Sequence, residues 1–223
     1  MRTLIALLAF VCLAYSSPAV QKSELDQRLR LFTAKFEELQ AKPNLRVPAS
    51  MLRQACGIVL LDRAKGGLVF GYQGGSGVAM VKDPRTGKWS APAFLSSNEG
   101  SFGLQIGGQT SFTVILLMNT NATKELIQPS FQFGGEASGT AGNSSGSQED
   151  ITSSVEPLML TYSDTSGLYG GAVVKGGTLS PDTKADVAYY GQYLTVDEIL
   201  FGNKVQPTEA ATYLADKLDQ YSK

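Results

Sequence analysis

The sequence predicts an α+β protein, in which an antiparallel, glycine-rich β-sandwich or barrel-like sheet is flanked by an N-terminal amphipathic helix and short helices. Three observations lead to this fold class. Residues 23–41 have a helical period of apolar side chains, short apolar runs separated by glycine begin at residue 57, and a second helical pattern follows Thr208. The chain is long enough for one domain with a substantial core.

The first 19 residues have the pattern of a secretory signal peptide. They contain, in order, Arg2, an apolar run over residues 4–14, and the small or turn-forming residues Ser16, Ser17, Pro18 and Ala19. The run is shorter than the roughly 20 residues that a membrane-spanning helix needs. Cleavage is expected after Ala19 or after Ser16, and bulky residues before Cys12 disfavour a lipoprotein. We therefore expect an exported protein, either secreted or periplasmic, that is peripheral to a membrane rather than inserted in it.

Residues 20–49 are predicted to form an amphipathic helix and a linker. The helix extends from Ser23 to Ala41, and Pro43 and Pro48 prevent its continuation. Its apolar residues recur at steps of four, three, four and three, which places them on one narrow stripe: Leu25, Leu29, Phe32, Phe36 and Leu39. Such a stripe either packs on the rest of the protein or enters a membrane surface, and the sequence leaves both readings open.

Residues 50–204 are predicted to form the β-rich domain, and residues 205–223 a C-terminal helix. A short helix is expected near Ser50, and Thr86-Gly87 favours a turn between two strands. The predicted strands are 57–61, 68–72, 78–82, 89–95, 102–109, 112–118, 131–136, 158–162 and 168–174. Between them we expect a helix capped by Thr120 or Asn121, a flexible loop over residues 137–150, and a helix with a capping box formed by Thr195 and Glu198.

Charge is distributed unevenly along a chain that is nearly neutral overall. Residues 20–65 contain nine basic and five acidic groups, whereas residues 66–223 contain nine basic and fifteen acidic groups. The N-terminal third is therefore a candidate surface for an anionic partner such as phospholipid, although solvation of the helix accounts for the same pattern. No feature indicates nucleic-acid binding.

The motifs that suggest enzymes fail on inspection. Residues 142–146 match the G-x-S-x-G pattern of hydrolases, but the chain has no histidine, so a Ser-His-Asp triad is excluded. Asp182 and Asp186 form the closest carboxylate pair, and a helix cap or turn explains them better than calcium. The glycines of residues 66–77 lack the spacing of a phosphate-binding loop. We expect no catalysis, no metal and no cofactor.

Four other residues are predicted to lie in the core. Cys56 is the single cysteine of the mature chain and adjoins an apolar run, so it is expected to act as a buried small hydrophobe. Trp89, Phe94 and Phe102 are likewise expected to be core residues rather than a ligand platform.

Several strings, in this order, resemble the SYLF family of lipid-binding domains. They are Ala55-Cys56-Gly57-Ile58-Val59, the stretch Gly71–Gly77, Trp89-Ser90-Ala91-Pro92-Ala93-Phe94, Gly100-Ser101-Phe102-Gly103-Leu104-Gln105-Ile106-Gly107, Tyr162-Ser163 with Gly167-Leu168, Tyr189-Tyr190-Gly191, and Glu198-Ile199-Leu200-Phe201-Gly202. The resemblance covers about residues 20–204. The SYLF family includes bacterial secreted proteins, the type that this chain resembles, and yeast members that also bind actin.

The resemblance implies non-enzymatic binding of anionic, phosphoinositide-like phospholipid, with the N-terminal helix contributing. The residues expected to contact lipid are Lys22, Leu25, Arg28, Leu29, Arg30, Phe32, Lys35 and Phe36. The chain departs from the family at residues 139–146, where a basic residue is missing. Because export separates the protein from actin, we do not expect actin as a partner. The alternative is a structural or interaction protein that binds a protein or glycan, with the helix as part of the core. The oligomeric state is left open.

Overall fold

The computed structural model describes residues 20–67, 70–102, 107–133, 158–167 and 177–223. The predicted signal peptide, the predicted loop 137–150 and the predicted strand 168–174 lie outside these ranges. No helix of the described part is both long and apolar enough to cross a membrane.

Within the described residues, seven strands form one antiparallel, barrel-like sheet, which confirms the predicted fold class. The strands are β1 (Gly57–Gly67), β2 (Phe70–Val81), β3 (Ala93–Phe102), β4 (Gly107–Leu117), β5 (Phe131–Phe133), β6 (Met159–Gly167) and β7 (Gly177–Pro181). Their order in the sheet is β5-β7-β3-β2-β1-β4-β6, and β1 is central, paired with β2 on one side and β4 on the other.

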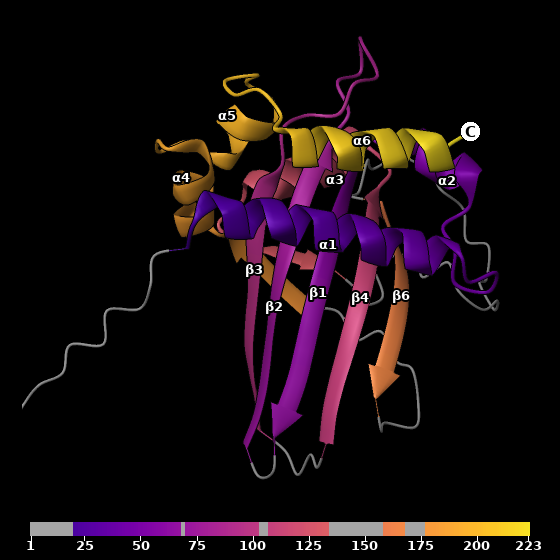
Figure 1. The fold of residues 1–223 in the computed structure, drawn as a ribbon, viewed down its shortest axis with the longest axis vertical. Helices are drawn as coiled ribbons and strands as arrows, with labels where there is room; N and C mark the ends of the chain where they lie inside the picture. Colours follow the sequence, from indigo (N-terminus) through magenta and orange to yellow (C-terminus); the bar gives the residue numbers. More distant parts are fainter. Residues whose placement is uncertain (1–19, 68–69, 103–106, 134–157, 168–176) are drawn as a thin grey trace, which may run out of the picture.

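Helices cover the sheet at one end and along one face (Figure 1). They are α1 (Lys22–Gln40), α2 (Ala49–Gln54), α3 (Thr120–Lys124) with the 3₁₀ turn η1 (Glu125–Ile127), α4 (Thr183–Tyr190), α5 (Val196–Leu200) and α6 (Glu209–Tyr221). Helices α1 and α6 lie side by side and run in the same direction. Two ion pairs connect them, Arg30 with Glu209 and Lys217 with Glu37.

Both faces of the central strands are buried, so the part of the chain that the structure describes has an apolar cluster on each side of the sheet. Along β1, Ile58 and Leu60 face the cluster under α1, α4 and α6, whereas Val59 and Leu61 face the cluster that includes β5, β7 and α5. Alternate residues of a strand point to opposite faces, which is why a continuous apolar run serves both clusters.

The glycines between residues 71 and 77 lie inside one strand and do not separate two. The sequence predicted separate strands at 68–72 and 78–82, whereas the structure has one continuous strand, β2, over Phe70–Val81. At Gly75 an added Cβ would lie 2.7 Å from Cγ of Arg63 and 2.8 Å from the carbonyl oxygen of Asp62. Glycine is therefore required here by the close approach of β1, not by a turn.

Other boundaries also differ from the sequence predictions. Trp89 makes only an isolated bridge to Lys82, and β3 begins at Ala93, after Pro92. Asn119, rather than Thr120 or Asn121, caps α3 through its side chain, which accepts a hydrogen bond from the backbone N–H of Ala122. Strand β7 and helix α4 were not predicted.

Several predictions are confirmed. Thr195 and Glu198 form the expected capping box at α5, the helix expected after Thr208 is α6, and Gly87 adopts a positive φ of 69° in the turn before β3. Trp89 and Phe94 are core residues, as expected. Cys56, in contrast, is only half-buried, with its Sγ 3.7 Å from the carbonyl oxygen of Met118, so the prediction of a buried thiol was wrong.

Helix α4 is attached to β3 by a buried carboxyl group. Asp186 is 1% exposed and accepts a hydrogen bond of 2.9 Å from the backbone N–H of Phe94, while the side chain of Asp182 caps the same helix. Burial raises the pKa of Asp186 from an ordinary value near 3.8 to about 7, with the charge of Asp182 adding to the shift and the Phe94 hydrogen bond opposing it.

We predict that Asp186 makes the protein more stable as the pH falls from about 8 towards 4. The folded state holds the proton more tightly than the unfolded chain, so this group contributes up to about 1.4 kcal/mol per pH unit across that window. The Asp186→Asn variant keeps a side-chain oxygen that can accept the hydrogen bond from the backbone N–H of Phe94, but its side chain does not titrate. Chemical denaturation of both proteins across the window should give a difference in free energy of unfolding that varies with pH. A constant difference would contradict the prediction.

We predict that Phe36→Ala lowers the free energy of unfolding by about 3–5 kcal/mol, because Phe36 on α1 is fully buried and the substitution leaves a cavity. The matched control is Leu31→Ala on the same helix, where the side chain is 49% exposed and the expected change is within about 0.5 kcal/mol. Thermal and chemical denaturation measure both. Equal stability of the two variants would mean that α1 is not docked in solution.

Candidate functional site

The apolar residues expected to enter lipid lie in the core. Leu25, Leu29, Phe32 and Phe36 are each at most 1% exposed and belong to the cluster between α1, α6 and the sheet. The ring of Phe32 lies 6.4 Å from that of Phe112, and the ring of Phe36 lies 5.6 Å from that of Tyr221 in an edge-on arrangement. The docked helix therefore hides this stripe and exposes a mainly polar side, in which Leu31 is the exception at 49% exposure.

Withdrawing α1 from the sheet would require a large free energy. Each large apolar side chain gains about 1.5–3 kcal/mol by burial, so the five residues of the stripe together gain roughly 10 kcal/mol. That figure is comparable to the total stability of a typical domain, about 5–15 kcal/mol. Asp26 on α1 adds to the attachment, because its carboxylate accepts hydrogen bonds from the hydroxyls of Tyr189 on α4 and Thr208 before α6.

The four basic residues expected to meet phosphate differ in their surroundings. Lys22 is exposed, with its Nζ 5.7 Å from the centre of the Tyr189 ring, and Arg28 is half-buried. Arg30 forms an exposed ion pair with Glu209 at 3.4 Å. Lys35 is held by Asp62 of β1. Lys22, Arg28 and Arg30 are thus accessible, and Lys35 is occupied.

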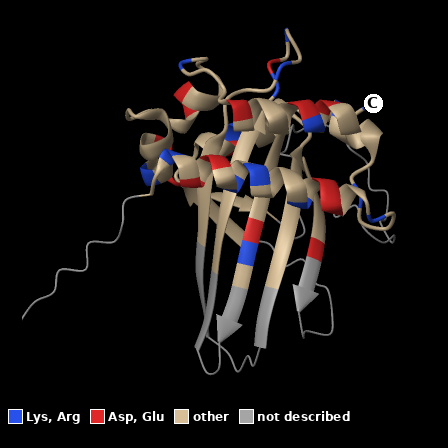
Figure 2. Cartoon of the chain, viewed as in Figure 1, with Lys and Arg blue, Asp and Glu red and all other residues tan. Residues whose placement is uncertain are grey.

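The uneven charge of the sequence does not produce a surface of one sign on the helices. Helix α1 carries four basic and four acidic residues, and α6 carries one basic and three acidic residues. Figure 2 shows both blue and red segments on each of the two helices. Any attraction of this layer to an anionic surface therefore depends on individual exposed cations.

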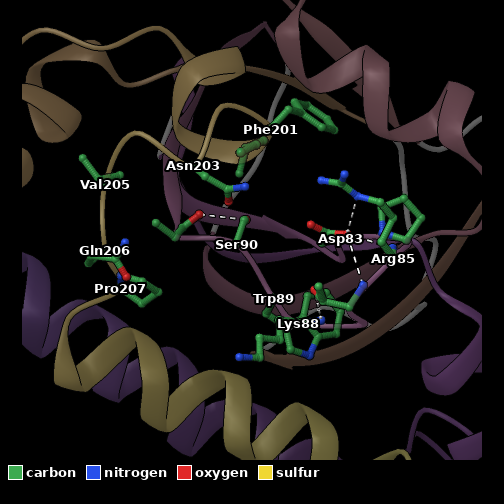
Figure 3. A pocket seen from close by; sticks show the side chains of 14 residues that line it. Asp83, Arg85, Lys88, Trp89, Ser90, Phe201, Asn203, Val205, Gln206 and Pro207 are labelled. Carbon is green, nitrogen blue, oxygen red and sulfur yellow. Dashed lines mark hydrogen bonds and ion pairs between the residues drawn. The ribbon is translucent and has the colours of Figure 1, made fainter.

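A hollow of about 600 Å³ lies between the turn that joins β2 to β3 and the segment that joins α5 to α6. It is lined by Asp83, Pro84, Arg85, Thr86, Lys88, Trp89, Ser90, Ala91, Leu200, Phe201, Asn203, Val205, Gln206 and Pro207. Figure 3 shows Phe201 and Asn203 on one side, Arg85 on another, and Gln206 and Pro207 on a third, with Ser90 and Asp83 between them. No pattern in the sequence indicates this site, because its two walls are more than 100 residues apart in the chain.

The turn wall is shaped by Asp83. Its carboxylate accepts hydrogen bonds from the backbone N–H groups of Arg85 at 2.7 Å and Thr86 at 3.2 Å, which is the usual way an aspartate organises a turn. These bonds, together with the charge of Arg85, lower the pKa of Asp83. The carboxylate is therefore ionised and already engaged, whereas Arg85 and Lys88 are exposed.

The opposite wall is shaped by the end of α5. Phe201 is 41% exposed. At Gly202 an added Cβ would lie 2.8 Å from the carbonyl oxygen of Glu198, and Asn203 has a positive φ of 49°. The chain therefore reverses immediately after Phe201 and leaves its ring at the rim of the hollow.

A second hollow, of about 270 Å³, adjoins the turn and shares Asp83, Pro84 and Phe201 with the first. Lys82 lies in its wall, and its Nζ donates to the carbonyl oxygen of Leu52 and sits 4.7 Å from the centre of the Trp89 ring. Burial lowers the pKa of Lys82. Within the described ranges no group of three or more histidine, cysteine, aspartate or glutamate residues is placed to hold a metal ion.

Comparison with known proteins identifies relatives over most of the chain. Residues 98–221 match the model of the family Ysc84, described as Las17-binding protein actin regulator. An SH3 domain-containing YSC84-like protein 1 from Rattus norvegicus is 28% identical over 199 residues, covering 86% of this chain and 57% of that protein. An SH3 domain-containing protein of Schizosaccharomyces pombe is 30% identical over 201 residues, covering 86% of this chain and 46% of that protein.

LAS seventeen-binding protein 3 of Saccharomyces cerevisiae is 29% identical over 170 residues, covering 74% of this chain and 36% of that protein. This chain thus spans about a third to three-fifths of the length of these curated relatives. No solved structure matches it. The family match extends over more than half of the chain. It contains the motifs from Gly100 onward and begins after the motif Trp89–Phe94, and the relatives extend the similarity towards the N-terminus. The chain therefore belongs to the Ysc84 family, which is the SYLF family whose motifs its sequence carries.

Proposed function

We propose that the protein is a non-enzymatic, peripheral binder of anionic, phosphoinositide-like phospholipid at a membrane surface. The observation that carries the proposal is an amphipathic helix α1 that keeps Lys22, Arg28 and Arg30 at or near the surface in a chain of the SYLF family. Cations close to an anionic membrane each contribute about 1 kcal/mol, so three of them support weak, salt-sensitive binding.

Two modes of contact are consistent with this function. In the docked mode α1 stays on the sheet and only its basic residues meet phosphate. In the inserted mode α1 leaves the sheet, so that Leu25, Leu29, Phe32 and Phe36 enter the headgroup boundary and Lys35 is released from Asp62. The burial of the stripe favours the docked mode in solution, because the inserted mode must first overcome the attachment of α1.

The second candidate function is binding of a protein partner. The full burial of the α1 stripe favours this function, because the apolar side of α1 is already covered by the sheet and does not require lipid to cover it. The family description names Las17 binding and actin regulation. For this chain, the predicted signal peptide argues for a partner, protein or glycan, outside the cytoplasm, and against actin.

We predict that the mature protein sediments with vesicles that contain phosphatidylserine or phosphoinositide, and not with purely zwitterionic vesicles. Binding should weaken between low and high salt, because screening reduces the attraction between exposed charges. Sedimentation at several salt concentrations measures both effects. Absence of binding to every composition would reject lipid binding and leave the protein-partner function.

We predict that Lys22→Glu with Arg28→Glu weakens vesicle binding by about tenfold or more, since two contributions of about 1 kcal/mol are removed and reversed. The matched control is Lys124→Glu with Lys184→Glu, which reverses two exposed charges on α3 and α4. If both double variants bind like the original protein, α1 is not a lipid contact in the docked mode.

A further inference from the structure

The turn between β2 and β3 projects from the molecule. Figure 1 shows this connection rising above α6 at the end of the molecule where the helices gather. Residues 84–88 are all exposed, and the side chain of Arg85 is 86% exposed. A projecting segment reaches a flat surface before the helix layer does, so its side chains would make the first contact.

The turn has two cations and one acid, and the acid is already engaged. Asp83 accepts two backbone hydrogen bonds, and the Nε of Arg85 lies 3.9 Å from its Oδ1, at the outer limit of an ion pair. Lys88 forms no side-chain hydrogen bond or ion pair with the described residues. The turn therefore offers Arg85 and Lys88 to an anion, and their donors match the oxygens of a phosphate group.

The space beside the turn suits a phosphorylated headgroup. The larger hollow has about 600 Å³, within the range of about 300–1,000 Å³ typical of small-molecule sites. Besides the two cations, its wall contains Ser90, Asn203 and Gln206, which can hydrogen-bond hydroxyl groups.

Phe201 adds an apolar contact on the same rim. It is 41% exposed and lines both hollows, so it stands beside the turn and not behind it. Phenylalanine is among the apolar residues with which peripheral proteins enter the headgroup boundary, and an exposed phenylalanine next to exposed cations is complementary to the boundary between anionic headgroups and acyl chains.

We propose that the turn Asp83–Lys88, together with Phe201 and the hollow between them, is a membrane-docking site that receives the phosphorylated headgroup of an anionic phospholipid. This inference rests on the proposed lipid binding and assigns it a surface outside α1. Arg85 and Lys88 contact phosphate, Phe201 enters the interface, and the hollow accommodates the polar headgroup. Docking at this site leaves α1 on the sheet.

The first test is Arg85→Glu with Lys88→Glu in vesicle sedimentation. We expect at least about a tenfold loss of binding to vesicles containing phosphatidylserine or phosphoinositide, since each cation contributes roughly fivefold near such a surface. Lys124→Glu with Lys184→Glu serves as the matched control and should bind like the original protein, because neither residue lines the hollows. Thermal denaturation checks that the variants remain folded.

A second measurement uses Trp89, the only tryptophan of the chain, which lines the larger hollow. Vesicles with a dansyl-labelled headgroup should accept energy from Trp89 on binding, and this transfer should disappear in the Arg85→Glu, Lys88→Glu variant. Phe201→Ser should weaken binding several-fold while leaving its salt dependence unchanged, because it removes an apolar contact and no charge.

The outcomes separate the two proposals. If the original protein binds no vesicle, lipid binding itself fails. If it binds and Arg85→Glu with Lys88→Glu binds equally well, the docking site is wrong and lipid binding stands. Binding of soluble inositol trisphosphate without any binding to vesicles would also overturn membrane docking, since the hollow would then recognise a free phosphate.

Discussion

The structure depends on a central sheet that is apolar on both faces. Strand β1 alternates between its two sides with large aliphatic residues at every position from Ile58 to Leu61, and all four are fully buried. Neither face can be left in water, so the fold needs a covering layer on each side. One layer is α1 with α4 and α6, and the other includes α5 and the short strands β5 and β7. The remaining elements are placed by this requirement.

This constraint assigns the amphipathic helix to the core. The stripe of α1 is as apolar as a membrane-binding helix would need, but the sheet beneath it is also apolar and lies within the same chain. Burial against the sheet involves no loss of translational freedom, whereas binding to a membrane does. The docked state is therefore the ground state of the free protein, and the proposed lipid contact begins from the surface that the docked state exposes.

The docked state exposes cations at the edges of the helix layer and at the turn before β3. Along α1 and α6 acidic residues accompany nearly every cation, so the two signs offset one another. At the turn, the two exposed cations Arg85 and Lys88 accompany one acid, Asp83, so the turn keeps a net positive charge. A net positive charge is what an anionic surface attracts, which makes the turn the better candidate for the proposed lipid contact although most of the basic excess of the sequence lies elsewhere.

The sequence by itself determined the local features whose cause lies within a few residues. The stripe of α1, the capping box of Thr195 and Glu198 and the helix after Thr208 each follow from residues three or four positions apart. The turn at Gly87 follows from neighbouring turn residues, and all of these features are present in the structure. The mixed α+β class followed from the same local periods. Glycine was ambiguous, because it permits a turn and also permits close packing, and only the nearness of Arg63 and Asp62 assigns Gly75 to a strand.

Tertiary structure decided which surfaces are hidden and which are brought together. No local pattern indicates that the α1 stripe packs against Phe112 and Tyr221. None indicates that Phe201 and Arg85 line the same hollow, since these residues lie far apart in the chain. An amphipathic pattern states only that one side of a helix avoids water. Whether a sheet or a membrane covers that side depends on contacts between distant segments, which are formed only when the whole chain folds.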